Sequence, residues 1–161
     1  MLDVRRGGPA DIEPAIAVWR AANEARRGGI PVRAEHESRV RSYAGRPDNF
    51  LVVAEDNGMF VGMALGMQGL ADDGAGPPIA GLCHIGLVFV APARWGEGIG
   101  RRVVEATLRE ARAAGYDRAQ LWTHADNIRA QRLYAGTGFR LSGRTKDDDE
   151  GAPIVHFERA L

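Results

Sequence analysis

Cysteine is almost absent from this sequence. The chain of 161 residues contains only Cys83, so it can form no internal disulfide and no cysteine-based metal site. Cys83 lies within the apolar run 81–90, where a lone cysteine usually behaves as a small core residue. We therefore assign no catalytic role to this thiol, and we expect no bound metal.

An excess of charge of one sign is also lacking. The 21 Lys and Arg residues balance the 21 Asp and Glu residues, so the formal net charge is +0. Nothing then draws the chain onto nucleic acid or an anionic membrane, and we expect neither as a partner. No apolar run approaches the roughly 18 residues that cross a bilayer, and the first residues lack the apolar core of a signal peptide. We expect a soluble, cytoplasmic protein.

Length and composition indicate one compact domain over residues 1–161. The hydrophobic fraction of 45% is ordinary for a globular protein and provides enough material for a sizeable core. The sequence contains no repeat, no low-complexity tract and no linker that would mark a second domain.

Hydrophobic periodicity predicts a mixed α/β domain with parallel and antiparallel strand pairs. Asn57 and Gly58 between two apolar runs indicate a hairpin, because both residues tolerate positive φ. The run 81–90 is almost wholly apolar, which is typical of a central strand covered on both faces. We expect strands at 2–5, 50–55, 59–67, 81–90, 118–123, 139–142 and 154–158, helices from 11 to before 28 and at 35–44, 99–114 and 127–135, and loops at 71–78 and 146–151.

A glycine-rich turn follows the central strand, and a helix begins directly after it. Gly96, Gly98 and Gly100 alternate at this junction. Glycines let the backbone approach a ligand closely, and the helix start adds unpaired N–H groups and a positive dipole end, which together suit a phosphate. A dinucleotide fingerprint needs glycine where Arg101 stands, and a nucleotide-triphosphate loop needs Gly-Lys-Ser/Thr, which is missing. A plain tight turn before a helix is the structural alternative.

The same segment resembles the acyl-CoA-binding motif of the GNAT family, Gln/Arg-x-x-Gly-x-Gly/Ala after a strand that ends apolar-x-Val-x-Pro. Val88, Val90 and Pro92 fit the strand ending, and Gly98 and Gly100 fit the glycine positions, whereas Trp95 stands where Gln or Arg is expected. The resemblance implies that backbone N–H groups of this turn bind the pyrophosphate of acetyl-CoA. Arg94, Arg101 and Arg102 then either contact coenzyme A phosphates or are solvated charges at a helix start.

A second segment, 127–139, resembles the other GNAT signature, Asn-x-x-Ala-x-x-Leu-Tyr-x-x-x-Gly-Phe, at every fixed position. On a helix, Ala130, Leu133 and Tyr134 share one side. The two motifs occur in the family's order, and together they identify the chain as similar to GNAT N-acetyltransferases and imply that fold. The residues then expected to bind acetyl-CoA are Val88, Phe89, Val90, Arg94, Trp95, Gly96, Glu97, Gly98, Ile99, Gly100, Arg101, Asn127, Ala130 and Tyr134.

The resemblance also implies a mechanism in which an amine attacks the thioester directly, without an acyl-enzyme. Backbone N–H groups near Val88 to Val90 would stabilise the charge on the carbonyl oxygen. Tyr134 matches the general acid of the family, since a phenol of pKa about 10 can protonate a departing thiolate of pKa about 8.5. For the base we select His84, which the expected alternation places on the face of Val88 and Val90. A hydrogen-bonded core histidine is the equal alternative.

Three further histidines are weaker candidates for the base: His124 first, then His36 and His156. The resemblance also implies that the acceptor contacts residues 25–41 and 146–153. The second of these segments contains the acidic run 147–150, which either attracts a cationic amine or is simply solvated.

The function that these observations favour is transfer of an acetyl group from acetyl-CoA to a small-molecule primary amine. Two alternatives remain at this point: a protein N-terminal or lysine acetyltransferase, and a non-catalytic acyl-CoA-binding sensor. Retention of Tyr134 and Asn127 argues against the sensor, which has no use for a leaving-group acid. The identity of the acceptor, the length of the acyl group and formation of a homodimer are left open by the sequence.

Overall fold

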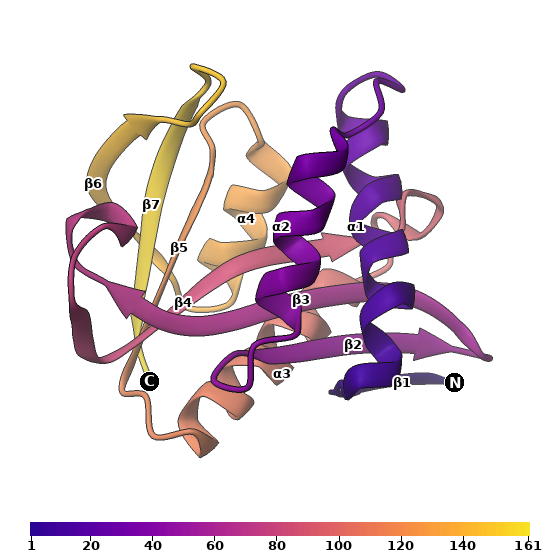
Figure 1. Cartoon of the computed structure of the whole chain (residues 1–161), viewed down its shortest axis with the longest axis horizontal. Helices are drawn as coiled ribbons and strands as arrows, with labels where there is room; N and C mark the ends of the chain where they lie inside the picture. Colours follow the sequence, from indigo (N-terminus) through magenta and orange to yellow (C-terminus); the bar gives the residue numbers. More distant parts are fainter.

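One mixed sheet of seven strands forms the centre of the protein, with two helices on each face (Figure 1). The computed structural model describes all residues, 1–161. The strands lie in the order β1-β2-β3-β4-β5-β7-β6, and only β4 and β5 run parallel to each other. This architecture confirms the predicted mixed α/β fold. The strands are β1 (Leu2–Arg6), β2 (Phe50–Asp56), β3 (Met59–Leu70), β4 (Pro78–Val90), β5 (Arg118–His124), β6 (Arg140–Asp147) and β7 (Pro153–Ala160).

Each face of the sheet is covered by one pair of helices. The helices α1 (Ile12–Arg26) and α2 (Ala34–Ala44) lie side by side in front of β2–β4 in Figure 1, and α3 (Ile99–Ala113) and α4 (Ile128–Gly136) lie behind the sheet. None of these helices combines the length and the apolar character that crossing a membrane requires.

Two separate hydrophobic clusters hold the layers together. In β2, Val52 and Ala54 pack on the face that α3 covers, whereas Leu51 and Val53 pack on the face of α1. Such alternation follows from the two-residue period of a strand. Trp19 of α1 is 1% exposed and belongs to the second cluster. Each fully buried large apolar side chain contributes roughly 1.5–3 kcal/mol, so both faces of the sheet stabilise the fold.

The strands β4 and β5 pair over only three residues. Leu82–His84 pair with Arg118–Gln120, and the ladder ends there. Beyond His84 the two strands diverge, and the β5-facing edge of β4 between 85 and 90 has no partner strand. Crevices at the carboxyl ends of parallel strands are common ligand sites, and this divergence determines where the cavity of the protein lies.

A β-bulge at Gly86 corrects one expectation about β4. Leu65 pairs with Leu87 and Gly66 pairs with Ile85, so β4 carries one extra residue. Cys83 and Ile85 face the α3 cluster before the bulge, and Val88 and Val90 face it afterwards. The predicted alternation, which placed His84 on the face of Val88 and Val90, was therefore wrong. His84 lies on the opposite face, the one to which Leu87 and Phe89 contribute.

Three element boundaries also differ from those expected. Strand β3 extends to residue 70 and β4 begins at 78, so the connecting loop, predicted at 71–78, is shorter and contains positive φ at Asp72, Asp73 and Gly74. Strand β6 extends to Asp147, beyond the predicted end at 142 and into the predicted loop at 146–151. This edge strand is mostly exposed and polar, so no apolar period marks its length.

A close contact at Gly66 generates a prediction about stability. A Cβ atom at this position would lie 2.2 Å from Cζ of Phe50, a side chain that is 4% exposed. We expect Gly66→Ala to lower the free energy of unfolding by about 1–3 kcal/mol, because the core must shift to admit the methyl group. Gly45→Ala is the matched control, since its nearest neighbour would be 3.6 Å away and its φ is −86°. Urea denaturation of the three proteins measures both effects; equal stability of the Gly66→Ala protein would contradict this packing.

Candidate active site

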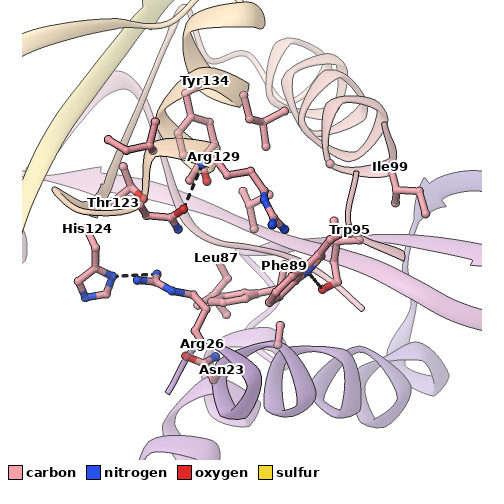
Figure 2. Close-up of a pocket in the computed structure, with 18 of the residues that line it drawn as sticks. Asn23, Arg26, Leu87, Phe89, Trp95, Ile99, Thr123, His124, Arg129 and Tyr134 are labelled. Carbon is pink, nitrogen blue, oxygen red and sulfur yellow. Dashed lines mark hydrogen bonds between the residues drawn. The ribbon is translucent and has the colours of Figure 1, made fainter. Parts of the chain in front are cut away.

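A cavity of about 730 Å³ opens where β4 and β5 separate (Figure 2). Its walls come from the C-terminal half of β4, the glycine-rich turn, the ends of β5 and α1, and the first turns of α4. The volume lies within the usual range for small-molecule and cofactor sites. Of the residues expected to bind acetyl-CoA, all but Glu97 line this cavity.

The glycine-rich turn presents the backbone of α3 to the cavity. Gly96 and Gly98 have φ values of 85° and 81°, a left-handed conformation that favours glycine. Gly98 is the N-cap of α3, and no side chain caps this helix start. The first N–H groups of α3 and the positive end of its dipole are therefore available to an anion. These features fit a pyrophosphate group, as the motif predicted.

The arginines near the turn are engaged within the protein. Arg94 donates to Glu97 at 2.9 and 3.0 Å and to Asp56 at 2.9 Å, and these hydrogen bonds raise its pKa. Arg101 donates to Glu105 and to the carbonyl oxygen of Gly136. Both arginines line the cavity, but Glu97 points its carboxylate at Arg94 and lies outside the lining.

Trp95 replaces the usual polar residue of the motif and anchors the turn in another way. Its indole N–H donates to the carbonyl oxygen of Val90 at 2.8 Å, which ties the turn to the end of β4. The guanidinium group of Arg129, on α4, lies 4.6 Å from the indole ring centroid (Figure 2). Such a cation–π contact contributes about 0.5–1 kcal/mol at an exposed site. It links the turn and α4, the two elements on either side of the cavity.

Asn127 and Tyr134 have distinct roles in the second motif. Asn127 is the N-cap of α4, and its side-chain oxygen accepts a hydrogen bond from the N–H of Ala130 at 3.2 Å. Tyr134 lines the cavity but is only 6% exposed, with Phe139 and Phe157 packed around its ring at 6.0 and 5.8 Å. Burial raises the pKa of Tyr134, so the phenol keeps its proton at neutral pH.

His84 is the last residue of β4 that pairs with β5, so it lies before the gap between these strands and does not line the cavity. Its Nδ1 is 3.4 Å from the side-chain nitrogen of Gln120, whose oxygen is 2.9 Å from Nε2 of His156; Nδ1 of His156 is 2.7 Å from the hydroxyl of Ser142. Burial, with smaller contributions from His156 and Lys146, lowers the pKa of His84 to about 4. A group of such low pKa accepts a proton poorly at neutral pH. The geometry therefore favours the alternative interpretation, a hydrogen-bonded core histidine.

A cluster of three polar residues lies at the end of the cavity that α1 borders, and the sequence alone gave only weak signals for it. His124 at the end of β5 contacts Arg26, the last residue of α1, and Asp148, which follows β6. All three line the cavity, as do Asn23 and Trp122, which no motif marked. The weak signals in the sequence were a histidine directly after a strand and an acidic run in a loop.

The comparisons with known proteins agree with this geometry. The sequence profile of the Acetyltransferase (GNAT) family matches residues 16–139, more than half of the chain. The chain belongs to this family. It is therefore an acyltransferase enzyme, which confirms the resemblance deduced from the two motifs.

Individual relatives of this GNAT protein differ in how much of it they cover. Peptidyl-lysine N-acetyltransferase YjaB of Salmonella typhimurium is 25% identical over 155 residues, covering 95% of this chain and 93% of its own. Mycothiol acetyltransferase of Kineococcus radiotolerans is 48% identical over 59 residues, but these make up 37% of this chain and only 19% of that protein. The solved structure of YncA from Salmonella typhimurium with acetyl-CoA has a TM-score of 0.75 at 19% identity, covering 100% of this chain and 94% of that one.

The burial of His84 predicts how stability depends on pH. Its pKa is about 4 in the folded protein against about 6.5 in an unfolded chain, so the unfolded state binds the proton more tightly. The stabilisation is complete above pH 6.5 and is lost as the pH falls towards 4, by up to about 3 kcal/mol. In His84→Gln this loss should disappear, whereas contributions of His36 and His156 remain in both proteins and cancel. Denaturant unfolding at pH 7 and pH 4 measures the difference; equal pH dependence in the two proteins would contradict the assignment.

Proposed function

We propose that this GNAT enzyme transfers the acetyl group of acetyl-CoA directly to a primary amine of a small-molecule acceptor. The observation that carries the proposal is a single cavity that holds three features together. These are the uncapped start of α3, the unpaired edge of β4, and the buried, protonated Tyr134. An acyl transfer needs a group that binds the donor, a group that stabilises the negative charge on the carbonyl oxygen, and an acid for the departing sulfur.

Acetyl-CoA supplies the acyl group as an activated thioester. The N–H groups of β4 that point into the gap after His84 are suited to the negative charge that develops on the carbonyl oxygen. They are held by the pairing of β4 with β3, so they need no reorganisation during the reaction. Tyr134 donates its proton to the sulfur as the C–S bond breaks and the C–N bond forms.

An acyl-enzyme is not part of this proposal. Cys83, the one thiol of the chain, is fully buried in the α3 cluster and does not line the cavity. Burial raises the pKa of this thiol to about 12, so it carries almost no thiolate at neutral pH. Direct attack by the amine agrees with this arrangement.

Two ion pairs beside the acceptor end of the cavity favour a small acceptor. Arg27 at the end of α1 lies 3.5 Å from Glu150, and Arg39 of α2 lies 4.0 Å from Asp149. These contacts join the α1–α2 segment to the loop between β6 and β7 and so bridge the far end of the site. Exposed ion pairs of this kind contribute little free energy, but an acceptor that extends past this end must break them, which favours a small acceptor.

Acetylation of a protein lysine is the second candidate. The observation in its favour is the relative named Peptidyl-lysine N-acetyltransferase YjaB, which matches nearly the full length of this chain. The two candidates are distinguished by measuring thiol release from acetyl-CoA with a panel of small primary amines and with lysine-containing peptides. Turnover with a small amine and none with the peptides supports our proposal; the reverse result would replace it with the protein-lysine function.

The role of Tyr134 leads to a prediction about the rate. We expect Tyr134→Phe to reduce kcat by roughly 10²–10⁴, because the phenol is the proton donor for the leaving sulfur. The affinity for acetyl-CoA should be unchanged, since the ring and its packing against Phe139 remain. Steady-state kinetics and calorimetric titration measure the two quantities separately. A Tyr134→Phe enzyme with the parental kcat would exclude Tyr134 as the acid.

A further inference from the structure

Three side chains from separate elements meet at the end of the cavity that α1 closes. In His124, Nδ1 lies 3.1 Å from Nη1 of Arg26 and Nε2 lies 2.8 Å from Oδ2 of Asp148. Figure 2 shows Arg26 reaching from α1 across the cavity to the imidazole ring. Alternation along β5 places Ala119 and Leu121 in the α3 cluster, so His124 follows on the side of the sheet that faces α1.

The two partners determine which nitrogen of His124 carries a proton. An ionised carboxylate can only accept a hydrogen bond, so Nε2 donates to Asp148. A guanidinium group can only donate, so Nδ1 accepts from Arg26 and must hold a lone pair. The imidazole is therefore neutral, with its basic nitrogen Nδ1 on the side of Arg26. His84 has no such pair of charged partners, since its ring contacts Gln120, and it does not line the cavity.

Asp148 is itself fixed by the loop that contains it. Its Oδ1 accepts from the backbone N–H groups of Glu150 at 2.9 Å and Ala152 at 2.8 Å, which leaves Oδ2 for His124. Burial alone would raise the pKa of Asp148, but these hydrogen bonds together outweigh it and hold the pKa below its usual value. The carboxylate is thus ionised and correctly placed at neutral pH.

We propose that His124 is the general base of the reaction, with Asp148 as its positioning residue. This inference rests on the proposed function. The acceptor amine displaces Arg26 from Nδ1, and its proton passes to Nδ1 as its nitrogen forms the C–N bond with the acetyl carbon. The sulfur leaves with the proton of Tyr134, and the imidazolium formed at His124 is stabilised by Asp148. Release of that proton to solvent and uptake of a proton by the Tyr134 phenolate then restore both groups for the next turnover.

The charged groups around His124 allow this displacement. Arg26 faces the ring from α1, and Asp148 faces it from the loop after β6. Asp126 lies beside them, with Oδ1 3.6 Å from Nη2 of Arg26. Arg26 therefore has a second partner that keeps it paired when it leaves Nδ1.

Asp148→Asn is the most specific variant for testing this inference. The asparagine oxygen can still accept from the N–H groups of Glu150 and Ala152, so the loop keeps its turn. Its amide nitrogen then faces His124 as a donor, so Nε2 becomes the acceptor and the proton moves to Nδ1. Arg26 can no longer donate to the ring and keeps Asp126 as its partner. The base is lost although the imidazole stays in place. Asp149→Asn is the control, because it removes the same charge from an exposed neighbouring side chain.

The first readout requires no substrate. Nitrogen NMR of the histidine side chains in the folded protein should show His124 with an unprotonated Nδ1, and the reverse tautomer in Asp148→Asn. Asp149→Asn should retain the parental tautomer. A wild-type protein whose Nδ1 carries the proton at neutral pH would overturn the proposal, whatever the enzyme acetylates.

The second readout is the pH profile of kcat/KM with the best amine of the panel. We expect His124→Gln and Asp148→Asn to lower kcat/KM by about 10²–10⁴ at neutral pH, with unchanged affinity for acetyl-CoA. The shape of the profile should also change in His124→Gln, because only the limb that belongs to the amine then remains. If the wild-type enzyme acetylates the amine and His124→Gln keeps its rate and profile, this inference fails while the proposed function stands. If the wild-type enzyme acetylates no amine at all, the proposed function fails, and this inference with it.

Discussion

The divergence of β4 and β5 after only three paired residues is the constraint on which the rest of the site depends. Strand pairing satisfies backbone N–H and C=O groups, and where it ends those groups face the gap. The same gap is bordered by the start of α3 and by α4, because both helices follow strands that end there. The cavity, the unpaired edge of β4 and the position of Tyr134 are consequences of this one opening.

The acid and the base that we propose, Tyr134 and His124, differ in their surroundings. Tyr134 is enclosed by aromatic rings, and the loss of solvent raises its pKa and keeps it protonated. His124 instead lies at the more open end of the cavity, where Asp148 and Arg26 define its tautomer by hydrogen bonding. The acid and the base that we propose thus lie at separate places along one cavity, which agrees with acid–base chemistry on two substrates.

Much of this arrangement could be predicted from the sequence, because its motifs are local. The alternating glycines and the segment that starts at Asn127 specify a strand, a turn and two helix starts through backbone conformation and capping, and the structure has each of them. The bulge at Gly86 could not be predicted, since one extra residue in a strand leaves the apolar run unchanged yet inverts every side chain after it. The contact of His124 with Arg26 likewise joins elements far apart in the chain, so no local pattern in the sequence predicts it.

The most direct test of the central claim is calorimetric titration of the protein with acetyl-CoA, compared with a variant in which the start of α3 is altered. The account predicts saturable 1:1 binding to the wild-type protein. It also predicts much weaker binding to Gly98→Val, because a β-branched residue does not adopt the φ of 81° on which the exposed N–H groups depend. A wild-type protein that binds no acetyl-CoA, or a folded Gly98→Val protein that binds it equally well, would contradict the assignment of this cavity and its glycine turn to the acyl donor.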